Sequence, residues 1–182
     1  CLAQVVTSSP IAMWPDIMQG YVRILLEARQ YVYLETPYFL PTDPVLFAMR
    51  TAAIAGVDVR LMVPRHSDAK LVEWASTSYI REAIEAGVKI CFYEDAFNHS
   101  KLLICDDMLC SCGSTNVDFR SFENNFESNI FFYDHDLTMR LKQVFLDDLT
   151  HCTVAETTAD LPHTPFYTRL WQASARLLSP LL

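Results

Sequence analysis

The chain has 182 residues, of which 51% are apolar and 12% aromatic, and it carries a formal net charge of −8. This composition excludes a disordered or collagen-like chain and is typical of a globular domain with a sizeable core. Acidic residues outnumber basic ones by 22 to 14, which disfavours a protein that coats DNA or RNA. No apolar run is long enough to span a membrane, and the first residues lack the pattern of a signal peptide. Because the sequence does not begin with Met, we expect a piece of a longer protein.

The first half of the chain predicts alternating helices and strands. Apolar residues recur there at helical or strand spacing, which predicts helices over 15–30, 43–56 and 68–87 and strands over 31–34, 57–63 and 88–93. Asp43 is the expected N-cap of the second helix, with Pro44 at its first position, and Asp68 is expected to open the third. Gly56 and Gly87 are expected to end these helices. The alternation predicts an α/β fold with a mixed, mostly parallel sheet flanked by helices.

The second half predicts a different pattern. Two short apolar runs on either side of Asp106-Asp107 predict an antiparallel hairpin over 100–112. We then expect, in order, a loop over 113–116, a strand over 126–133, a helix over 137–149, a surface connection over 153–165 and a terminal helix over 167–182. The inward residues of the helix over 137–149 are expected to be Leu141, Val144, Phe145 and Leu149. The terminal helix is expected to dock on the core, and a helix on a membrane surface is the alternative. With no boundary visible, we expect one domain over 1–182.

Six cysteines lie within largely apolar runs, at positions 1, 91, 105, 110, 112 and 152. This pattern favours reduced, buried thiols over a disulfide framework. A zinc site on Cys110 and Cys112 with Cys105 or Cys152 is the alternative, but structural zinc usually requires longer spacers. We expect no metal and no cofactor.

His99 and Lys101 are the first candidates for chemistry. Residues two apart on a strand point to one face, so the imidazole and the ammonium should converge, while Asp106 falls on the other face. An imidazole beside a fixed ammonium can attack phosphorus while the charge on the phosphoryl oxygens is neutralised. Asp106 is expected to brace the hairpin or a basic partner.

The loop that follows supplies further polar groups. Gly113, Ser114 and Asn116 offer a hydroxyl, an amide and backbone N–H groups to the same phosphate. On the next strand, Glu127 is expected to accept the Nδ1 proton of His99 and leave the other ring nitrogen free to attack. A lone histidine before a strand is ordinarily a surface residue. However, the spacing of all six positions from His99 to Asn116 makes a chance match negligible.

These residues resemble the His-x-Lys-x4-Asp and Gly-Ser-x-Asn signature of the phospholipase D superfamily. The segments 35–41, 116–122 and 125–129, and the terminus at 179–182, are similar to the bacterial cardiolipin synthases in that superfamily. The resemblance covers nearly the whole chain. It implies catalytic roles for His99, Lys101, Asp106 and Glu127 and phosphate binding by Ser114 and Asn116.

The resemblance also implies a mechanism. In that family two such motifs face each other across one active site; one histidine forms a phosphohistidine and the other protonates the leaving alcohol. A second phosphatidylglycerol then accepts the phosphatidyl group, and cardiolipin and glycerol form without a metal or cofactor. This sequence holds a single motif, since none of its other histidines is followed two residues later by Lys. We therefore expect a C-terminal half, one phospholipase D-like domain whose partner is the missing N-terminal half or a second copy.

The resemblance implies that the parent protein lies at the cytoplasmic face of a bacterial membrane. It also implies that this fragment is soluble and that, on its own, it is inactive or nearly inactive.

Two other functions remain open. A phosphodiesterase or nuclease in which two single-motif chains pair is disfavoured by the acidic charge balance, so we expect no nucleic acid partner. A non-catalytic lipid-binding domain would have no need to keep all six positions of the signature.

Overall fold

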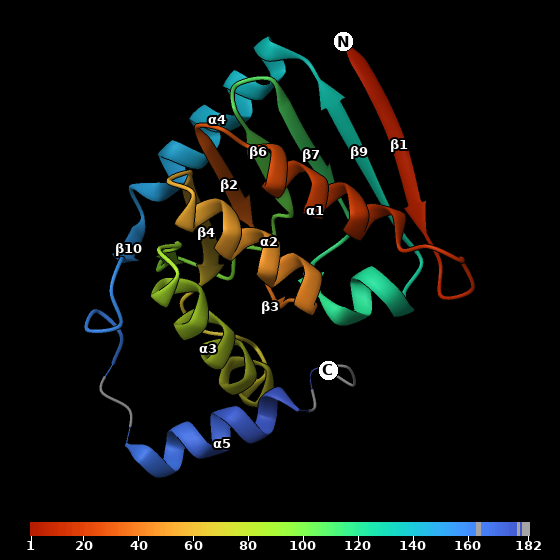
Figure 1. The fold of residues 1–182 in the computed structure, drawn as a ribbon. Helices are drawn as coiled ribbons and strands as arrows, with labels where there is room; N and C mark the ends of the chain where they lie inside the picture. The colour runs from red at the N-terminus through yellow and green to blue at the C-terminus, as the bar shows by residue number, and fades with distance from the viewer. Residues whose placement is uncertain (163–164, 178, 180–182) are drawn as a thin grey trace.

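The fold is built on an eight-stranded sheet with the strand order β1-β9-β7-β6-β2-β4-β5-β10 (Figure 1). The computed structural model describes residues 1–162, 165–177 and 179. The strands are β1 (Leu2–Ser8), β2 (Tyr31–Glu35), β4 (Asp58–Pro64), β5 (Lys89–Tyr93), β6 (Leu102–Cys105), β7 (Leu109–Gly113), β9 (Glu127–Tyr133) and β10 (Cys152–Ala155). A second, two-stranded sheet pairs β3 (Phe39–Leu40) with β8 (Val117–Asp118). The helices are α1 (Asp16–Glu27), α2 (Asp43–Ile54), α3 (Lys70–Glu85), α4 (His135–Leu149), α5 (Phe166–Arg176) and the short π-helix η1 (Arg120–Asn124).

The mixed sheet flanked by helices is confirmed, but the prediction that it is mostly parallel is wrong. Among the described strands of the large sheet only β2 with β4 and β4 with β5 pair in parallel, and the other five pairings are antiparallel. The parallel part is the strand–helix–strand segment that the first half of the sequence predicts. The rest is antiparallel because β6 and β7 form the hairpin and β1 and β10 add at the two edges.

Helices cover both faces of the sheet. On one face α1, α2 and α3 pack on alternate strand residues such as Val32, Leu34 and Leu61, and on the other α4 packs through Phe145 on Tyr31 and Tyr33 (Figure 1). Strand β2 is therefore buried on both faces, which explains its unbroken run of large side chains. Strand β2 ends at Glu35, and the candidate site lies just beyond that end.

The hairpin between β6 and β7 is confirmed. Its two central residues, Asp106 and Asp107, have φ of 47° and 59°, as a tight turn between twisted strands requires. Aspartate adopts this left-handed conformation more readily than most residues.

Two helix starts differ from prediction. The N-cap of α2 is Thr42, with Asp43 already inside the helix. Helix α3 begins at Lys70 with Ala69 as its N-cap, and the Asp68 carboxylate accepts a hydrogen bond from the Tyr38 hydroxyl at 2.8 Å. In α4, Phe145 is fully buried and Leu141 and Leu149 are partly buried, whereas Val144, predicted to face inward, is 48% exposed.

Two edge strands do not follow from the sequence pattern. Strand β1 pairs with β9 in full register from Leu2 against Tyr133 to Ser8 against Glu127. Strand β10 pairs with β5 inside the segment expected to be a surface connection.

All six cysteines are free, as expected; Cys91, Cys105 and Cys110 are buried, but Cys1 and Cys112 are exposed.

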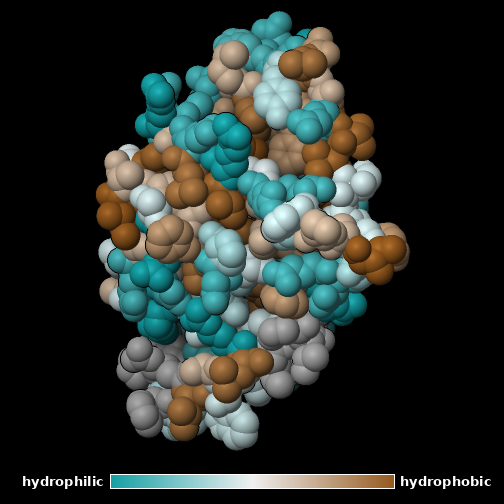
Figure 2. All heavy atoms as spheres, turned by 45° about the vertical axis from the view of Figure 1, so that its right-hand side comes forward, coloured by the Kyte–Doolittle hydropathy of each residue, from teal (hydrophilic) through white to brown (hydrophobic). Residues whose placement is uncertain are grey.

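The terminal helix docks on the core in its described part. Gln172 and Ala175 are buried against the domain, and the Arg176 guanidinium lies 2.5 Å from the Glu82 carboxylate of α3. The opposite face of α5 exposes Tyr167, Leu170 and Trp171, and Figure 2 shows hydrophobic atoms gathered over this helix at the lower end of the molecule. The predicted extension to residue 182 lies outside the described residues. In the described part of the chain no helix is both long and apolar enough to cross a bilayer.

Candidate functional site

The candidate site lies at one end of the large sheet, where four strands start or stop. Strand β2 ends at Glu35, which pairs with Leu102 at the start of β6, and β7 ends at Gly113, which pairs with Asn129 of β9. The segment before β6 carries His99 and Lys101. The loop after β7 carries Ser114 and Asn116. The pairing of these strands therefore brings four of the six predicted site residues to the same end.

The side chains of His99 and Lys101 lie together, as the sequence predicts. The Lys101 Nζ lies 3.1 Å from His99 Nδ1 and 3.3 Å from Nε2, and it also donates to the His99 carbonyl at 2.9 Å. Desolvation lowers the pKa of Lys101, while the charges of Glu127 and Asp118 act to raise it. The imidazole stacks on Phe97, with ring centroids 5.9 Å apart, and meets Tyr38 edge-on at 6.5 Å.

Glu127 reaches Ser114 rather than His99. The Ser114 hydroxyl donates a short hydrogen bond to Glu127 Oε2, and the Asn125 side chain donates to Oε1 at 3.2 Å. Among the described residues no hydrogen bond joins Glu127 to His99, so the expected acceptance of the Nδ1 proton is not observed. The reason is local: the Lys101 ammonium lies beside Nδ1, and both carboxylate oxygens already have donors.

Asn116 belongs to a small polar network beneath the site. Its side-chain nitrogen donates to Ser121 at 3.3 Å, and the Ser121 N–H donates to the Asp118 carboxylate at 2.6 Å. The side-chain oxygen of Asn116 is buried without a hydrogen-bond partner. Burial raises the pKa of Asp118, whose charge also faces Lys101. Sequence reasoning did not identify Asp118 as a site residue; its signal was an acidic side chain in a short apolar strand.

Gly113 has a steric role. A Cβ at this position would clash with the Asn129 side-chain oxygen and with the Ser128 carbonyl. Asn129 is itself fully buried, where it donates to Tyr21 and Ser111 and accepts from the Thr115 N–H at 3.3 Å. Glycine is thus needed so that the loop can pass close to β9.

Asp106 lies at the opposite end of β6 from Lys101. The four residues of β6 lie between them, which puts their Cα atoms about 16 Å apart in an extended chain. The Asp106 carboxylate accepts hydrogen bonds from three consecutive backbone N–H groups, those of Arg29, Gln30 and Tyr31, at 2.7–2.9 Å. The residue therefore fastens the hairpin to the start of β2, as expected for bracing. We infer a positioning role from these contacts, and a catalytic role for Asp106 stays a prediction.

Glu35 is a site neighbour that the sequence analysis missed. It is 2% exposed, with one carboxylate oxygen unpartnered and the other 3.5 Å from the side-chain nitrogen of Asn98, which precedes His99. Burial, and secondarily the charge of Asp148, raises the pKa of Glu35 to about 7. The sequence offered one signal for Glu35, which is that a charged residue ends an otherwise apolar, buried strand.

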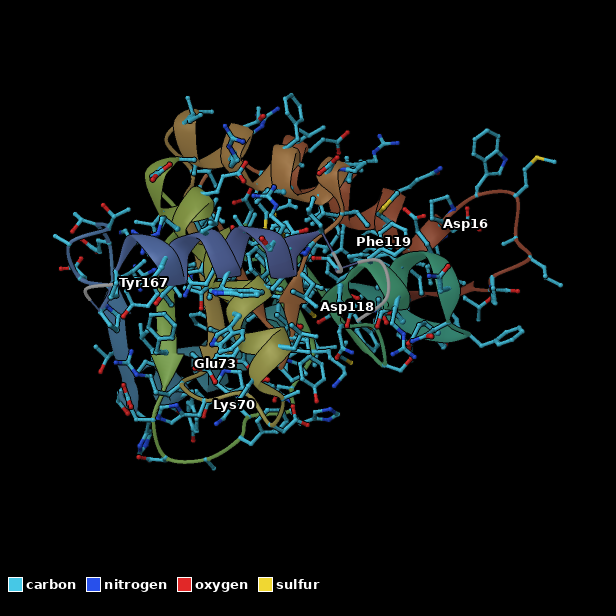
Figure 3. The ribbon with its side chains drawn as sticks, turned by 90° about the horizontal axis from the view of Figure 1, so that it is seen from below. Asp16, Lys70, Glu73, Asp118, Phe119 and Tyr167 are labelled. Atoms are coloured by element: carbon cyan, nitrogen blue, oxygen red, sulfur yellow. The ribbon has the colours of Figure 1, made fainter. Side chains whose placement is uncertain are left out.

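A polar hollow of about 340 Å³ adjoins these residues. It is lined by Tyr38, Asp68, Asn116, Asp118 and Asn125, among others. Figure 3 shows the loop with Asp118 and Phe119 on the same side of the molecule as the start of α3, where Lys70 is labelled. The described residues include no cluster of three or more His, Cys, Asp or Glu side chains arranged to hold a metal ion.

Comparison with solved structures supports the fold. A phosphatidylserine synthase from Haemophilus influenzae superposes on 99% of this chain with a TM-score of 0.75 at 16% identity, and the match covers 48% of that protein. The phospholipase D family member Nuc from Salmonella typhimurium superposes on 86% with a TM-score of 0.71 at 16% identity, and the match covers 99% of that protein. At these identities the likeness concerns the fold alone.

Sequence comparison identifies the family. Cardiolipin synthases from Clostridium perfringens and Bacillus cereus are 40% and 43% identical to the chain over 180 residues, which is 99% and 98% of it. The chain spans little more than a third of these relatives, 38% and 35% of their lengths. Residues 21–149 match the family described as cardiolipin synthase, PLD-like domain. The chain therefore belongs to the phospholipase D-like domain family of the cardiolipin synthases.

Proposed function

We propose that the chain supplies one half of an active site in which two phosphatidylglycerol molecules yield cardiolipin and glycerol. The observation that carries this proposal is the pair of His99 and Lys101, whose imidazole and ammonium nitrogens lie 3.1 Å apart at the site end of the sheet. The relatives named cardiolipin synthase support the choice of phospholipid over other phosphodiesters.

In the first proposed step an imidazole nitrogen of His99 attacks the phosphorus of phosphatidylglycerol. The phosphorus–nitrogen bond forms while the bond from phosphorus to the terminal glycerol oxygen breaks. The Lys101 ammonium turns from the imidazole to the phosphoryl oxygens and stabilises their negative charge. The leaving glycerol takes its proton from an acid of the opposing half-site.

In the second step a hydroxyl of another phosphatidylglycerol attacks the same phosphorus. The phosphorus–nitrogen bond breaks, the hydroxyl proton passes to the opposing group that protonated the leaving glycerol in the first step, cardiolipin forms and His99 is restored. In this proposal the Ser114 hydroxyl turns from Glu127 to donate to a phosphoryl oxygen, and Asn116 supports the loop from below. Glu127 and Asp118 help Lys101 to stay protonated.

The opposing acid is expected from the remainder of the parent protein or from a second copy of this chain. We further propose that the parent acts at the cytoplasmic face of a bacterial membrane. A paired nuclease is the second candidate, but the net charge of −8 disfavours a polyanionic substrate.

The test is to trap the covalent intermediate. Parent protein mixed with phosphatidylglycerol is quenched rapidly, digested and examined by mass spectrometry. We expect a phosphatidyl adduct on the peptide that contains His99, absent from the His99→Ala variant. An adduct on the opposing histidine alone would assign His99 the role of acid. Normal cardiolipin formation by His99→Ala would contradict the site, and cleavage of plasmid DNA without lipid transfer would favour the nuclease.

A further inference from the structure

A second hollow, of about 390 Å³, lies behind Tyr38 between α3 and α5. Its volume is within the range of small-molecule pockets. Much of its wall is apolar, made by side chains from β3, β4, α3, β5 and the segment before α5: Phe39, Val63, Val72, Ile80, Phe92 and Leu161. Neither the phosphate chemistry above nor the packing of the core accounts for this space.

The apolar hollow adjoins the polar hollow of the site. Tyr38 and Val72 line both, so these two residues form a shared wall between the apolar space and the hollow that Asn116 and Asp118 line. On its other side the Tyr38 ring meets the His99 ring edge-on, with centroids 6.5 Å apart. A ligand with its phosphate at His99 and Lys101 would therefore have Tyr38, a wall residue of the apolar space, beside it.

We propose that this hollow binds an acyl chain of the phospholipid whose phosphate lies at His99. The inference rests on the proposed function and adds to it a recognition site for the lipid tail. An amphiphile fits because the two hollows share a wall but differ in polarity. The partly or fully exposed residues Arg65, His66 and Ser67 also line the apolar hollow and can donate hydrogen bonds to the ester carbonyls at the head of the chain.

Helix α5 forms the outer wall of this hollow. Thr168 and Gln172 face the space, and the contact of Arg176 with Glu82 holds the helix on α3. The outward face of the same helix exposes Tyr167, at 67%, and Trp171, at 64%. Aromatic side chains of this kind suit the boundary between lipid and water, which is where an acyl chain would enter.

The test compares ligands that share a headgroup and differ in chain length. Binding of glycerophosphoglycerol, dihexanoyl- and dioctanoyl-phosphatidylglycerol to this chain is measured below their micelle concentrations. Trp74 lines the hollow and reports binding by fluorescence once Trp14 and Trp171, which do not line it, are replaced by Phe. We expect affinity to rise about fourfold for each methylene that enters the hollow.

Two matched variants on α3 locate the effect. Ser76 lines the hollow and Ser78 does not, and neither position is in the proposed machinery. Ser76→Leu should remove the gain with chain length and leave the affinity for glycerophosphoglycerol unchanged, whereas Ser78→Leu should keep the gain. An unchanged gain in Ser76→Leu with an unaltered melting temperature would overturn the inference. So would equal binding of octyl glucoside, because the hollow would then take any alkyl chain.

Failure of the proposed function has a different signature. In that case the Lys101→Ala variant would bind glycerophosphoglycerol with the same affinity as the unaltered 182-residue chain. A gain with chain length that survives Lys101→Ala but is lost in Ser76→Leu would support the tail site while contradicting the phosphate site.

Discussion

The hydroxyl of Ser114 donates a hydrogen bond to the carboxylate of Glu127, and the same hydroxyl oxygen accepts the Ser128 N–H at 3.1 Å. This pair joins the end of β7 to the start of β9. The Glu127 charge also faces the Lys101 ammonium. The carboxylate therefore positions a hydroxyl and supports a cation without contacting the imidazole.

Glu127→Gln should lower phosphatidyl transfer by the parent protein by roughly one to two orders of magnitude, less than His99→Ala. The amide keeps the shape of the side chain but loses the charge that raises the pKa of Lys101, so the alkaline limb of the rate profile should move to lower pH. The measurement is turnover between pH 5 and 9. A profile identical to that of the parent would contradict this role.

His99→Ala should reduce transfer to background, because it removes the proposed nucleophile or acid while the exposed side chain contributes little to folding. Lys101→Ala should cost about a hundredfold or more, the usual cost of losing one donor to a developing oxyanion. Arg140→Ala, an exposed cation on α4, is the charge control and should leave transfer unchanged. Near-normal turnover in either site variant would be inconsistent with the assignment.

Asp106→Ala should destabilise the fold but spare the chemistry. The change leaves three backbone N–H groups without their acceptor and puts alanine at a φ of 47°, and we expect a loss of about 2 kcal/mol. The melting temperature should fall by roughly 4–8 °C, with less effect in Asp106→Asn, which keeps one side-chain oxygen. Turnover per folded molecule should stay near that of the parent; a loss as severe as in His99→Ala would place Asp106 in the catalytic set.

Strand parity and local pattern were enough to predict the central parts of the site. The pairing of His99 with Lys101 follows from a spacing of two on an extended chain, and the hairpin turn follows from Asp106-Asp107 between apolar runs. The polar loop after the hairpin made Ser114 and Asn116 further candidates, and the resemblance implied phosphate binding for both. All of these inferences depend on residues close together in the sequence.

Features that depend on distant residues could not be predicted in this way. Strand β1 pairs with residues more than a hundred positions away, and several of its apolar side chains are exposed, so it has no clear amphipathic pattern. Strand parity gave Glu127 a face of the strand but could not choose between Ser114 and His99 as its partner. The environment of Glu35 is set by β6 and α4, which follow much later in the chain.

Glu35→Gln should remove part of the pH dependence of stability. Burial raises the pKa of Glu35 from 4.5 to about 7, so the folded state favours the neutral acid and loses stability as the pH rises from about 4.5 through 7. The groups that face this carboxyl include Asp148, Tyr93 and Cys152, none of which supplies a positive charge. The variant should match the parent chain near pH 4.5 and exceed its free energy of unfolding by up to about 3 kcal/mol at pH 8. Urea denaturation at both values measures the gap, and an equal gap at the two pH values would contradict the role of this group.

The 182-residue chain on its own should bind phosphate or sulfate weakly and turn over no phosphatidylglycerol. His99, Lys101 and Ser114 supply one wall of the proposed site, but the acid for the leaving glycerol belongs to the opposing wall. Without that wall, water enters and screens the charge of Lys101 from the phosphate. A symmetric dimer offers one way to restore the site, because it would bring two copies of His99 face to face. The measurement is cardiolipin formation by the purified chain over a hundredfold range of protein concentration, beside anion binding followed through the His99 ring by NMR. Turnover that rises with the square of protein concentration and disappears in His99→Ala would show that two copies form a complete site, and the expectation of inactivity would then be wrong.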